Sequence, residues 1–123
     1  MKDRSFIDTN IWVYAHLDAA GSKCAQALHL LENLPVLVSS TQVLSEYYSV
    51  MLKKKVADPL IQDNIEAIVG VSDIQTITLN TLRDTHRLKL RYGFSYWDSL
   101  ILAAALVQVG LHAIDVDKAA IFF

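Results

Sequence analysis

Short apolar runs alternate with stretches of helical periodicity along the whole chain. Residues 5–7 are the first such run and predict a strand, which the polar trio Asp8, Thr9 and Asn10 ends. The next apolar positions, in residues 11–17, predict a short helix. The chain therefore opens as a strand followed by a helix, with an acidic residue at the junction.

The segment that follows predicts a helix, a strand and another helix. A helix is expected between Ser22 and Pro35. Residues 36–38 are a β-type run, and the hydroxyl cluster of residues 39–41 is a good N-cap for a helix over residues 41–55. The apolar face of the first of these helices is predicted to consist of Ala25, Leu28, Leu31 and Leu34.

The same alternation continues past the middle of the chain. Asp58, which is followed by a proline at the first helical position, starts a helix that ends near Gly70. Residues 74–79 contain a β-like stretch, and a basic helix then continues to about Arg91. The cap of that basic helix is predicted to be Asn80 or Thr81.

The C-terminal region completes the pattern. Gly93 breaks the basic helix, Ser95 caps a long apolar helix that ends at Gly110, and residues 111–114 predict a last strand. Strands separated by helices indicate parallel pairing, because parallel neighbours need a crossover connection. We expect one domain over residues 1–123 with an α/β fold: a three-layer α/β/α sandwich with a parallel sheet of at least four strands.

Two acidic segments lie where ligand sites usually form in such a sheet. Asp8 directly follows the first strand, and Asp115 and Asp117 directly follow the last one. In open parallel sheets, ligands bind beyond the carboxyl ends of the strands. Taken alone, each of these acids is more simply explained as a helix cap or a loop residue.

A third acidic position is Asp98. Its spacing from Ser95 is that of a capping box, and the positive end of the helix dipole favours its ionised form. Residues 99–106 contain a single polar side chain, Ser99, so the helix is expected to be buried on all sides. A carboxylate at the mouth of a buried helix needs partners, although capping alone also explains it.

Helix geometry places a fourth acid, Glu46. Val50 lies about 40° from it around the helix and Val43 about 60°. Glu46 therefore borders the apolar stripe, where its stem could simply cover the edge of the core.

Together these acids predict a metal site. Converging carboxylates repel one another and raise each other's pKa unless a cation joins them. Mg²⁺ or Mn²⁺ is the natural cation for a shell of oxygen ligands and water. Such a metal lowers the pKa of bound water and stabilises the charge of a phosphoryl transition state.

Three segments resemble the motifs of the PIN-domain family. Residues 6–14, Phe-Ile-Asp-Thr-Asn-Ile-Trp-Val-Tyr, are similar to its opening signature. Residues 41–48 resemble its second motif, and residues 94–105 resemble its third. The resemblance covers nearly the whole chain and is specific in combination.

The resemblance implies a parallel α/β/α fold and phosphodiester hydrolysis at an Mg²⁺ or Mn²⁺ site. Asn10 would order this site by hydrogen bonding, with Thr9 beside it. Single-domain members often resemble VapC-type toxins, which cut RNA and are silenced by a cognate antitoxin, and we also expect a homodimer. By position, the metal-binding acids would be Asp8, Glu46, Asp98 and Asp117.

The C-terminal stretch departs from the family pattern. The family usually has Ser or Thr, one further residue and then Asp after the last strand, whereas here the stretch is Asp115, Val116 and Asp117. Asp117 would be the fourth acid, and Asp115 would replace the hydroxyl residue as an auxiliary ligand. The segment beyond, residues 118–123, is shorter than usual.

Composition limits the other possibilities. The chain has 123 residues, 53% of them hydrophobic, and a formal net charge of -2, so any contact with nucleic acid must be local. With one cysteine, Cys24, neither a disulfide within the chain nor a cysteine-based zinc site can form. The N-terminus lacks an apolar signal core and no run is long enough to span a membrane, so we expect a soluble cytoplasmic protein.

Basic and aromatic residues are candidate RNA contacts. Residues 53–55 are three lysines, and the basic helix carries Arg83, Arg87, Lys89 and Arg91. A solvated helix face explains these charges equally well. The aromatic residues Tyr47, Tyr48, Tyr92, Tyr96 and Trp97 could stack on bases, although core or subunit contacts explain most of them more simply.

Two other functions stay open. A phosphoacceptor receiver domain also has an acidic Mg²⁺ pocket, but it needs paired acids after its first strand, where only Asp8 stands here. A PIN-like domain that binds RNA or a protein partner without cleavage is favoured by the altered C-terminus.

Overall fold

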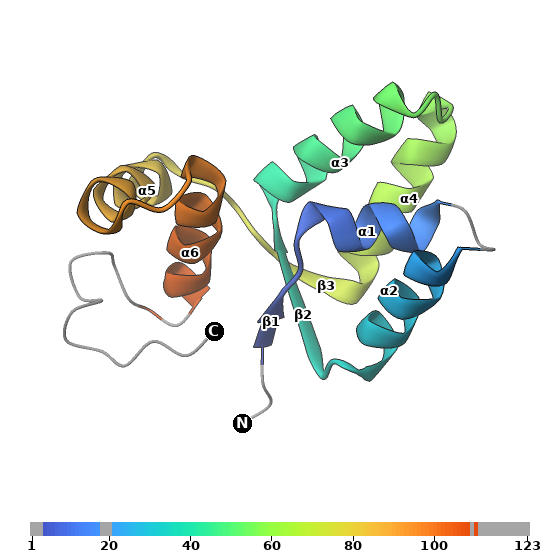
Figure 1. Cartoon of the computed structure of the whole chain (residues 1–123), viewed down its shortest axis with the longest axis horizontal. Coiled ribbons are helices and arrows are strands. Elements are labelled where there is room, and N and C mark those ends of the chain that lie inside the picture. The colour runs from blue at the N-terminus through green and yellow to red at the C-terminus, as the bar shows by residue number, and fades with distance from the viewer. Residues whose placement is uncertain (1–3, 18–20, 109, 111–123) are drawn as a thin grey trace. The chain divides into compact units, whose positions relative to one another are not determined.

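The computed structural model describes residues 4–17, 21–108 and 110 (Figure 1). The predicted last strand, residues 111–114, and the predicted site residues Asp115 and Asp117 lie outside this range. The elements in chain order are β1 (Arg4–Phe6), α1 (Thr9–His16), α2 (Ser22–Asn33), β2 (Val36–Ser40), α3 (Thr41–Lys53), α4 (Asp58–Val71), β3 (Ser72–Gln75), α5 (Leu79–Tyr92) and α6 (Tyr96–Gln108).

The chain divides into two compact units. The first is Met1–Ile74 and contains β1, β2 and α1 to α4; the second is Gln75–Phe123 and contains α5 and α6. That the chain forms one domain stays a prediction. None of the helices in the described ranges is both long enough and apolar enough to cross a membrane.

The three described strands form one sheet in the order β1-β2-β3. β1 pairs with β2 in parallel, with Arg4 opposite Val36 and Phe6 opposite Val38. A backbone hydrogen bond of 2.8 Å from Ile7 N to Val38 O continues the pairing past the end of β1. This confirms the predicted parallel sheet, and it brings the carboxyl ends of β1 and β2 to the same edge.

Several helix boundaries differ from the predicted ones by up to two residues. α1 begins at Thr9 rather than at residue 11, since the Asp8 carboxylate accepts a hydrogen bond from Thr9 N. α3 ends at Lys53, and the chain then turns through Lys55, which has a positive φ of 63°. α4 begins at Asp58, with Ala57 rather than Asp58 in the cap position.

The buried face of α2 agrees with the prediction only in part, because Leu31 and Leu34 pack against the core as expected. Ala25 and Leu28 are exposed, whereas Cys24 and Ala27 are buried at 5% and 3% exposure. Cys24 Sγ lies 3.6 Å from the carbonyl oxygen of Ala15 on α1. The small side chains let α2 approach α1 closely, and this tertiary contact outweighs the burial of the larger leucine.

In the second unit α5 packs against α6, and the turn between the two helices was predicted correctly at both ends. Gly93 takes the left-handed conformation after α5, with a φ of 71°, and its N–H donates to Lys89 O. Ser95 Oγ then accepts a hydrogen bond of 3.1 Å from Asp98 N at the start of α6. Between the helices, the buried side chains Leu88, Ala103 and Leu106 form the core of this unit.

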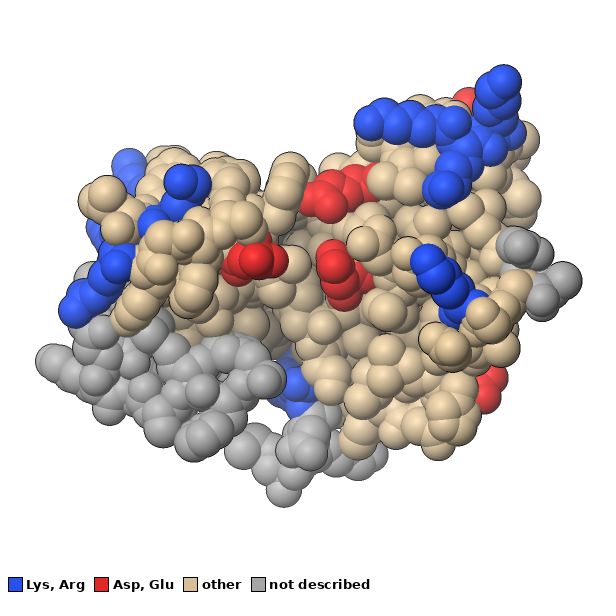
Figure 2. Space-filling view, in the orientation of Figure 1, with Lys and Arg blue, Asp and Glu red and all other residues tan. Residues whose placement is uncertain are grey.

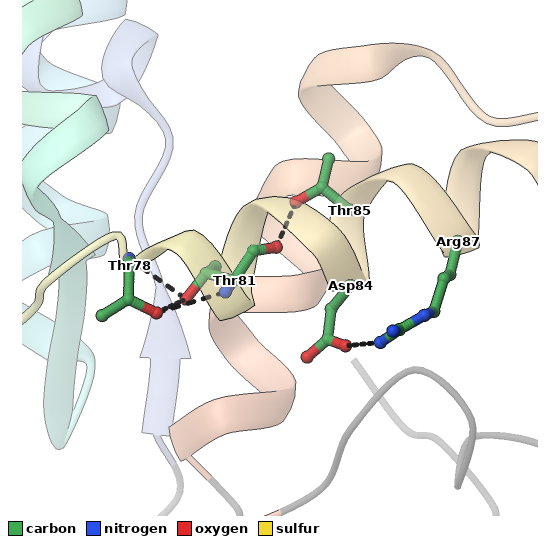
Figure 3. Close-up of polar contacts among 5 residues, drawn as sticks. All are labelled: Thr78, Thr81, Asp84, Thr85 and Arg87. Carbon is green, nitrogen blue, oxygen red and sulfur yellow. Dashed lines mark hydrogen bonds and ion pairs between the residues drawn. The ribbon is translucent and has the colours of Figure 1, made fainter.

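The start of α5 corrects two predictions. The cap is Thr78, not Asn80 or Thr81, and it forms a reciprocal capping box with Thr81 (Figure 3). The strand β3, Ser72–Gln75, begins before the predicted β-like stretch of residues 74–79 and overlaps it only at Ile74 and Gln75.

A buried polar contact links three helices of the first unit. Tyr47 on α3 is completely buried, and its hydroxyl lies 2.8 Å from Nδ1 of His16 on α1. Burial raises the pKa of Tyr47, which a hydrogen bond with the Asn64 side chain on α4 opposes, and burial lowers the pKa of His16. With the imidazole neutral, its Nδ1 can accept a hydrogen bond from the tyrosine hydroxyl, which gives this buried hydroxyl a partner.

This contact predicts an acid-sensitive stability. The pKa of His16 in the folded chain lies below its ordinary value of 6.5, so below pH 6.5 the unfolded chain binds more protons. The contribution is fully present above pH 6.5 and is lost as the pH falls through the window between 6.5 and the lowered pKa. Urea unfolding of the full chain at a series of pH values should show this loss.

Two variants separate His16 from the other histidines. His16→Gln should flatten the pH dependence in that window, whereas His29→Gln, at an exposed position of α2, should leave it unchanged. An unaltered pH dependence in the His16 variant would contradict the assignment.

Candidate functional site

The common edge of β1 and β2 brings two of the predicted acids together. Asp8 follows β1 directly, and Glu46 lies on α3, which begins where β2 ends. Thr9 connects them: its N–H donates to Asp8 Oδ1 at 2.7 Å, and its hydroxyl donates to Glu46 Oε2 at 3.0 Å. Thr9 is only 4% exposed, so its two hydrogen bonds hold both carboxylates beside one buried residue.

Packing of α3 fixes the position of Glu46. Ser40 Oγ caps the helix by accepting a hydrogen bond of 3.1 Å from Val43 N. Val43 and Tyr47 are buried on either side of Glu46 in the sequence, and Glu46 itself is half-buried. The prediction that this glutamate borders the apolar stripe is confirmed.

This pair fits a hard divalent cation in its chemistry. An exposed aspartate and a half-buried glutamate offer oxygen ligands, which Mg²⁺ and Mn²⁺ prefer, while leaving room for water. Across the described ranges 4–17, 21–108 and 110, no three His, Cys, Asp or Glu side chains form a group that could hold a metal ion. The four-acid site therefore stays a prediction.

Asp98 lies in the second unit, on the first turn of α6. The helix is less enclosed than predicted: Tyr96, Trp97 and Asp98 are exposed, and burial begins at Ser99. Asp98 therefore has access to solvent and does not depend on a buried partner for its charge. Its role, like those of Asp115 and Asp117 outside the described residues, stays a prediction.

Asn10 lies exposed on the first turn of α1, next to Thr9. Its position, one residue beyond the bridging threonine, is compatible with the predicted ordering role. That role is untested by the contacts described for α1.

Sequence reasoning missed a buried carboxylate on α5. Asp84 is 3% exposed, and its Oδ1 lies 3.1 Å from Nη1 of Arg87 (Figure 3). The i, i+3 spacing of the two residues was the available signal. This ion pair favours a structural role for Arg87, which the sequence offered as a candidate RNA contact.

On the face drawn in Figure 2, side chains of like charge gather in places on each unit. On the first unit, acidic side chains lie where α1 and α3 begin, and basic side chains gather at the far end of α3 (Figure 2). On the second unit, the basic side chains gather over α5 (Figure 2). The balanced net charge of the chain thus hides local patches of both signs.

Comparisons with known proteins agree with this architecture. The family model of the PIN domain matches residues 5–118. No curated protein matches the chain significantly.

Two solved structures share the fold. VapC20 of Mycobacterium tuberculosis, a Sarcin-Ricin loop cleaving toxin, is 18% identical with a TM-score of 0.69, and the match covers 89% of this chain and 85% of that one. VapBC2 from Rickettsia felis, bound to a DNA fragment from its promoter, is 19% identical with a TM-score of 0.61, covering 87% and 83%. The predicted α/β fold class is confirmed.

The bridging role of Thr9 predicts a specific stability loss. Thr9→Val keeps the shape of the side chain but removes the hydroxyl that donates to Glu46, so the free energy of unfolding should fall by about 1 kcal/mol. Thr9→Ser keeps the donor and serves as the matched control. Urea unfolding measures the free energy of unfolding of both variants. A valine variant as stable as the unmodified chain would show that this hydrogen bond does not stabilise the fold.

Proposed function

The chain belongs to the PIN-domain family, and from this premise we propose that it is a metal-dependent endoribonuclease, the toxin of a toxin–antitoxin pair. The observation that carries the proposal is the Thr9 bridge, which places Asp8 and Glu46 side by side at the carboxyl edge of the parallel sheet. These residues occupy the acidic positions of the first two family motifs. RNA is the proposed substrate, and the cytoplasm is the proposed place of action.

Each acid has a proposed role in holding Mg²⁺ or Mn²⁺. The metal ligands would be Asp8, Glu46, Asp98 and Asp117. When bound, the ion supplies an activated water and neutralises charge on the phosphoryl group. The chain's own part is positional: Thr9 holds the Glu46 carboxylate in one orientation, Asn10 orders the site by hydrogen bonding, and Asp115 assists as an auxiliary group.

The relatives support the regulatory half of the proposal. One similar structure is named as a toxin, and the other is a VapBC complex on promoter DNA. By analogy, this chain would bind a cognate antitoxin and form a homodimer. An antitoxin arginine that reaches the carboxylates would inhibit by replacing the charge of the metal.

A second candidate function is binding of RNA or a protein partner without cleavage. The specific observation in its favour is Asp115, which stands where the family has a hydroxyl residue. The same cleavage assay decides between the two functions.

We expect the chain to cleave RNA in the presence of Mg²⁺ or Mn²⁺, and we expect EDTA to abolish this cleavage. Asp8→Asn, Glu46→Gln and Asp98→Asn should each lower the cleavage rate by about 100-fold or more, because each removes a proposed ligand charge and the loss of a group that only orients a ligand already costs about 10- to 100-fold. Asp63→Asn, at an exposed position of α4, is the control and should retain full activity. Cleavage that persists undiminished in EDTA would rule out the metal mechanism.

The C-terminal acids are distinguished by a paired substitution. Side chains two residues apart on an extended chain point the same way, so either acid could face the metal. The family pattern selects Asp117, so Asp117→Asn should weaken Mn²⁺ binding and cleavage more than Asp115→Asn does. Near-normal activity in both variants would show that this stretch supplies no ligand, leaving Asp8, Glu46 and Asp98.

A further inference from the structure

Four exposed aromatic side chains follow one another between α5 and α6. We call them the aromatic patch: Tyr92, Phe94, Tyr96 and Trp97, with 38%, 43%, 38% and 49% of their surface exposed. The chain's other tryptophan, Trp12, is only 3% exposed because it lies in the core of the first unit. Large aromatic surface left in water often marks a binding site.

The rings of the aromatic patch are held in fixed mutual positions. Tyr92 and Phe94 stack with their centroids 5.5 Å apart and their planes 16° from parallel. Tyr96 and Trp97 meet edge to face at 5.6 Å. Because the Gly93 turn and the Ser95 cap fix the backbone between them, little side-chain freedom is lost when a flat ligand stacks on these rings.

The charge around the aromatic patch is positive although the whole chain is slightly acidic. Residues 84–98 contain three cations, Arg87, Lys89 and Arg91, against two carboxylates, Asp84 and Asp98, so the local balance is slightly positive. Arg87 is paired with Asp84, but Lys89 is exposed and the Arg91 guanidinium lies 5.8 Å from the centroid of the Tyr92 ring. The patch thus combines aromatic faces with cations, as binding sites for single-stranded nucleic acid do.

We propose that the aromatic patch binds unpaired bases of single-stranded RNA, with Lys89 and Arg91 contacting the phosphates. The inference rests on the proposed ribonuclease function, since Asp98 follows Trp97 on the same exposed turn of α6. A strand stacked on Trp97 therefore lies beside a proposed metal ligand. A duplex hides its base faces, so the patch selects unpaired segments as substrate.

Other occupants fit the surface less well. Aromatic rings with arginine also occur in protein–protein interfaces, but lysine is depleted there, whereas the exposed Lys89 suits contact with phosphate. Phosphate charge complements Lys89 and Arg91, and the local cations supply the contact that the acidic net charge otherwise disfavours.

The two tryptophans provide a direct readout. In EDTA, which prevents metal-dependent cleavage, titration of the full chain with a single-stranded RNA oligonucleotide should quench the emission of exposed Trp97 and leave that of buried Trp12 unchanged. The same sequence presented as a duplex should bind about ten-fold more weakly. Trp97→Phe should remove the quenching but keep the affinity, measured by anisotropy of labelled RNA.

Matched variants test the stacking and the charge separately. Trp97→Ala and Tyr96→Ala should each weaken binding of the single strand about ten-fold, whereas Leu60→Ala, on an exposed position of α4, should not change it. Lys89→Ala should weaken binding and reduce its salt dependence, and Lys23→Ala, at an exposed position of α2, is the charge-matched control that should change neither. Circular dichroism of each variant checks that the chain remains folded.

The outcomes separate this inference from the proposed function. Equal affinity for single strand and duplex, or unchanged affinity in Trp97→Ala, would overturn the aromatic patch as an RNA site. Quenching that depends on protein concentration alone would assign it to a second copy of the chain instead. Binding that behaves as expected without any cleavage in Mn²⁺ would refute the nuclease and leave the RNA site standing.

Discussion

The parallel pairing of β1 with β2 is the constraint on which the rest of the structure depends. Parallel neighbours end at the same edge of a sheet, so the residue after β1 and the helix after β2 start next to each other. Asp8 and Glu46 are far apart in the sequence, yet this geometry lets one buried threonine hydrogen-bond to both. An antiparallel pairing would have placed them at opposite ends of the strands.

The buried contact of Tyr47 with His16 stabilises the same pair of helices, α1 and α3. Both the Thr9–Glu46 and the His16–Tyr47 hydrogen bonds join α1 to α3, and Glu46 and Tyr47 are adjacent in sequence. A polar group buried without a partner costs more than the bond itself gains, so a satisfied pair favours one arrangement of the two helices. Stability and site geometry therefore depend on the same helix interface.

Local signals in the sequence determined the order of the elements, the parallel α/β class and several exact turns. Gly93 and Ser95 were identified correctly because left-handed glycines and N-cap hydroxyls act within a few residues of chain. The positions of two candidate acids within the elements were also predicted correctly, since Asp8 follows the first strand and Glu46 lies within the helix over residues 41–53. The combination of motifs then indicated the family, which the match over residues 5–118 establishes.

Only the tertiary structure decided which face of α2 is buried and which hydroxyl joins the two acids. Periodicity allowed Leu28 to face the core, but close packing against α1 selected Cys24 and Ala27, because small side chains permit a shorter separation between helices. The contact of Tyr47 with His16 could not be predicted from the sequence either, since neither residue type nor spacing specifies a contact between residues so far apart in the chain. Such contacts are set by the packing of distant segments, which no local pattern encodes.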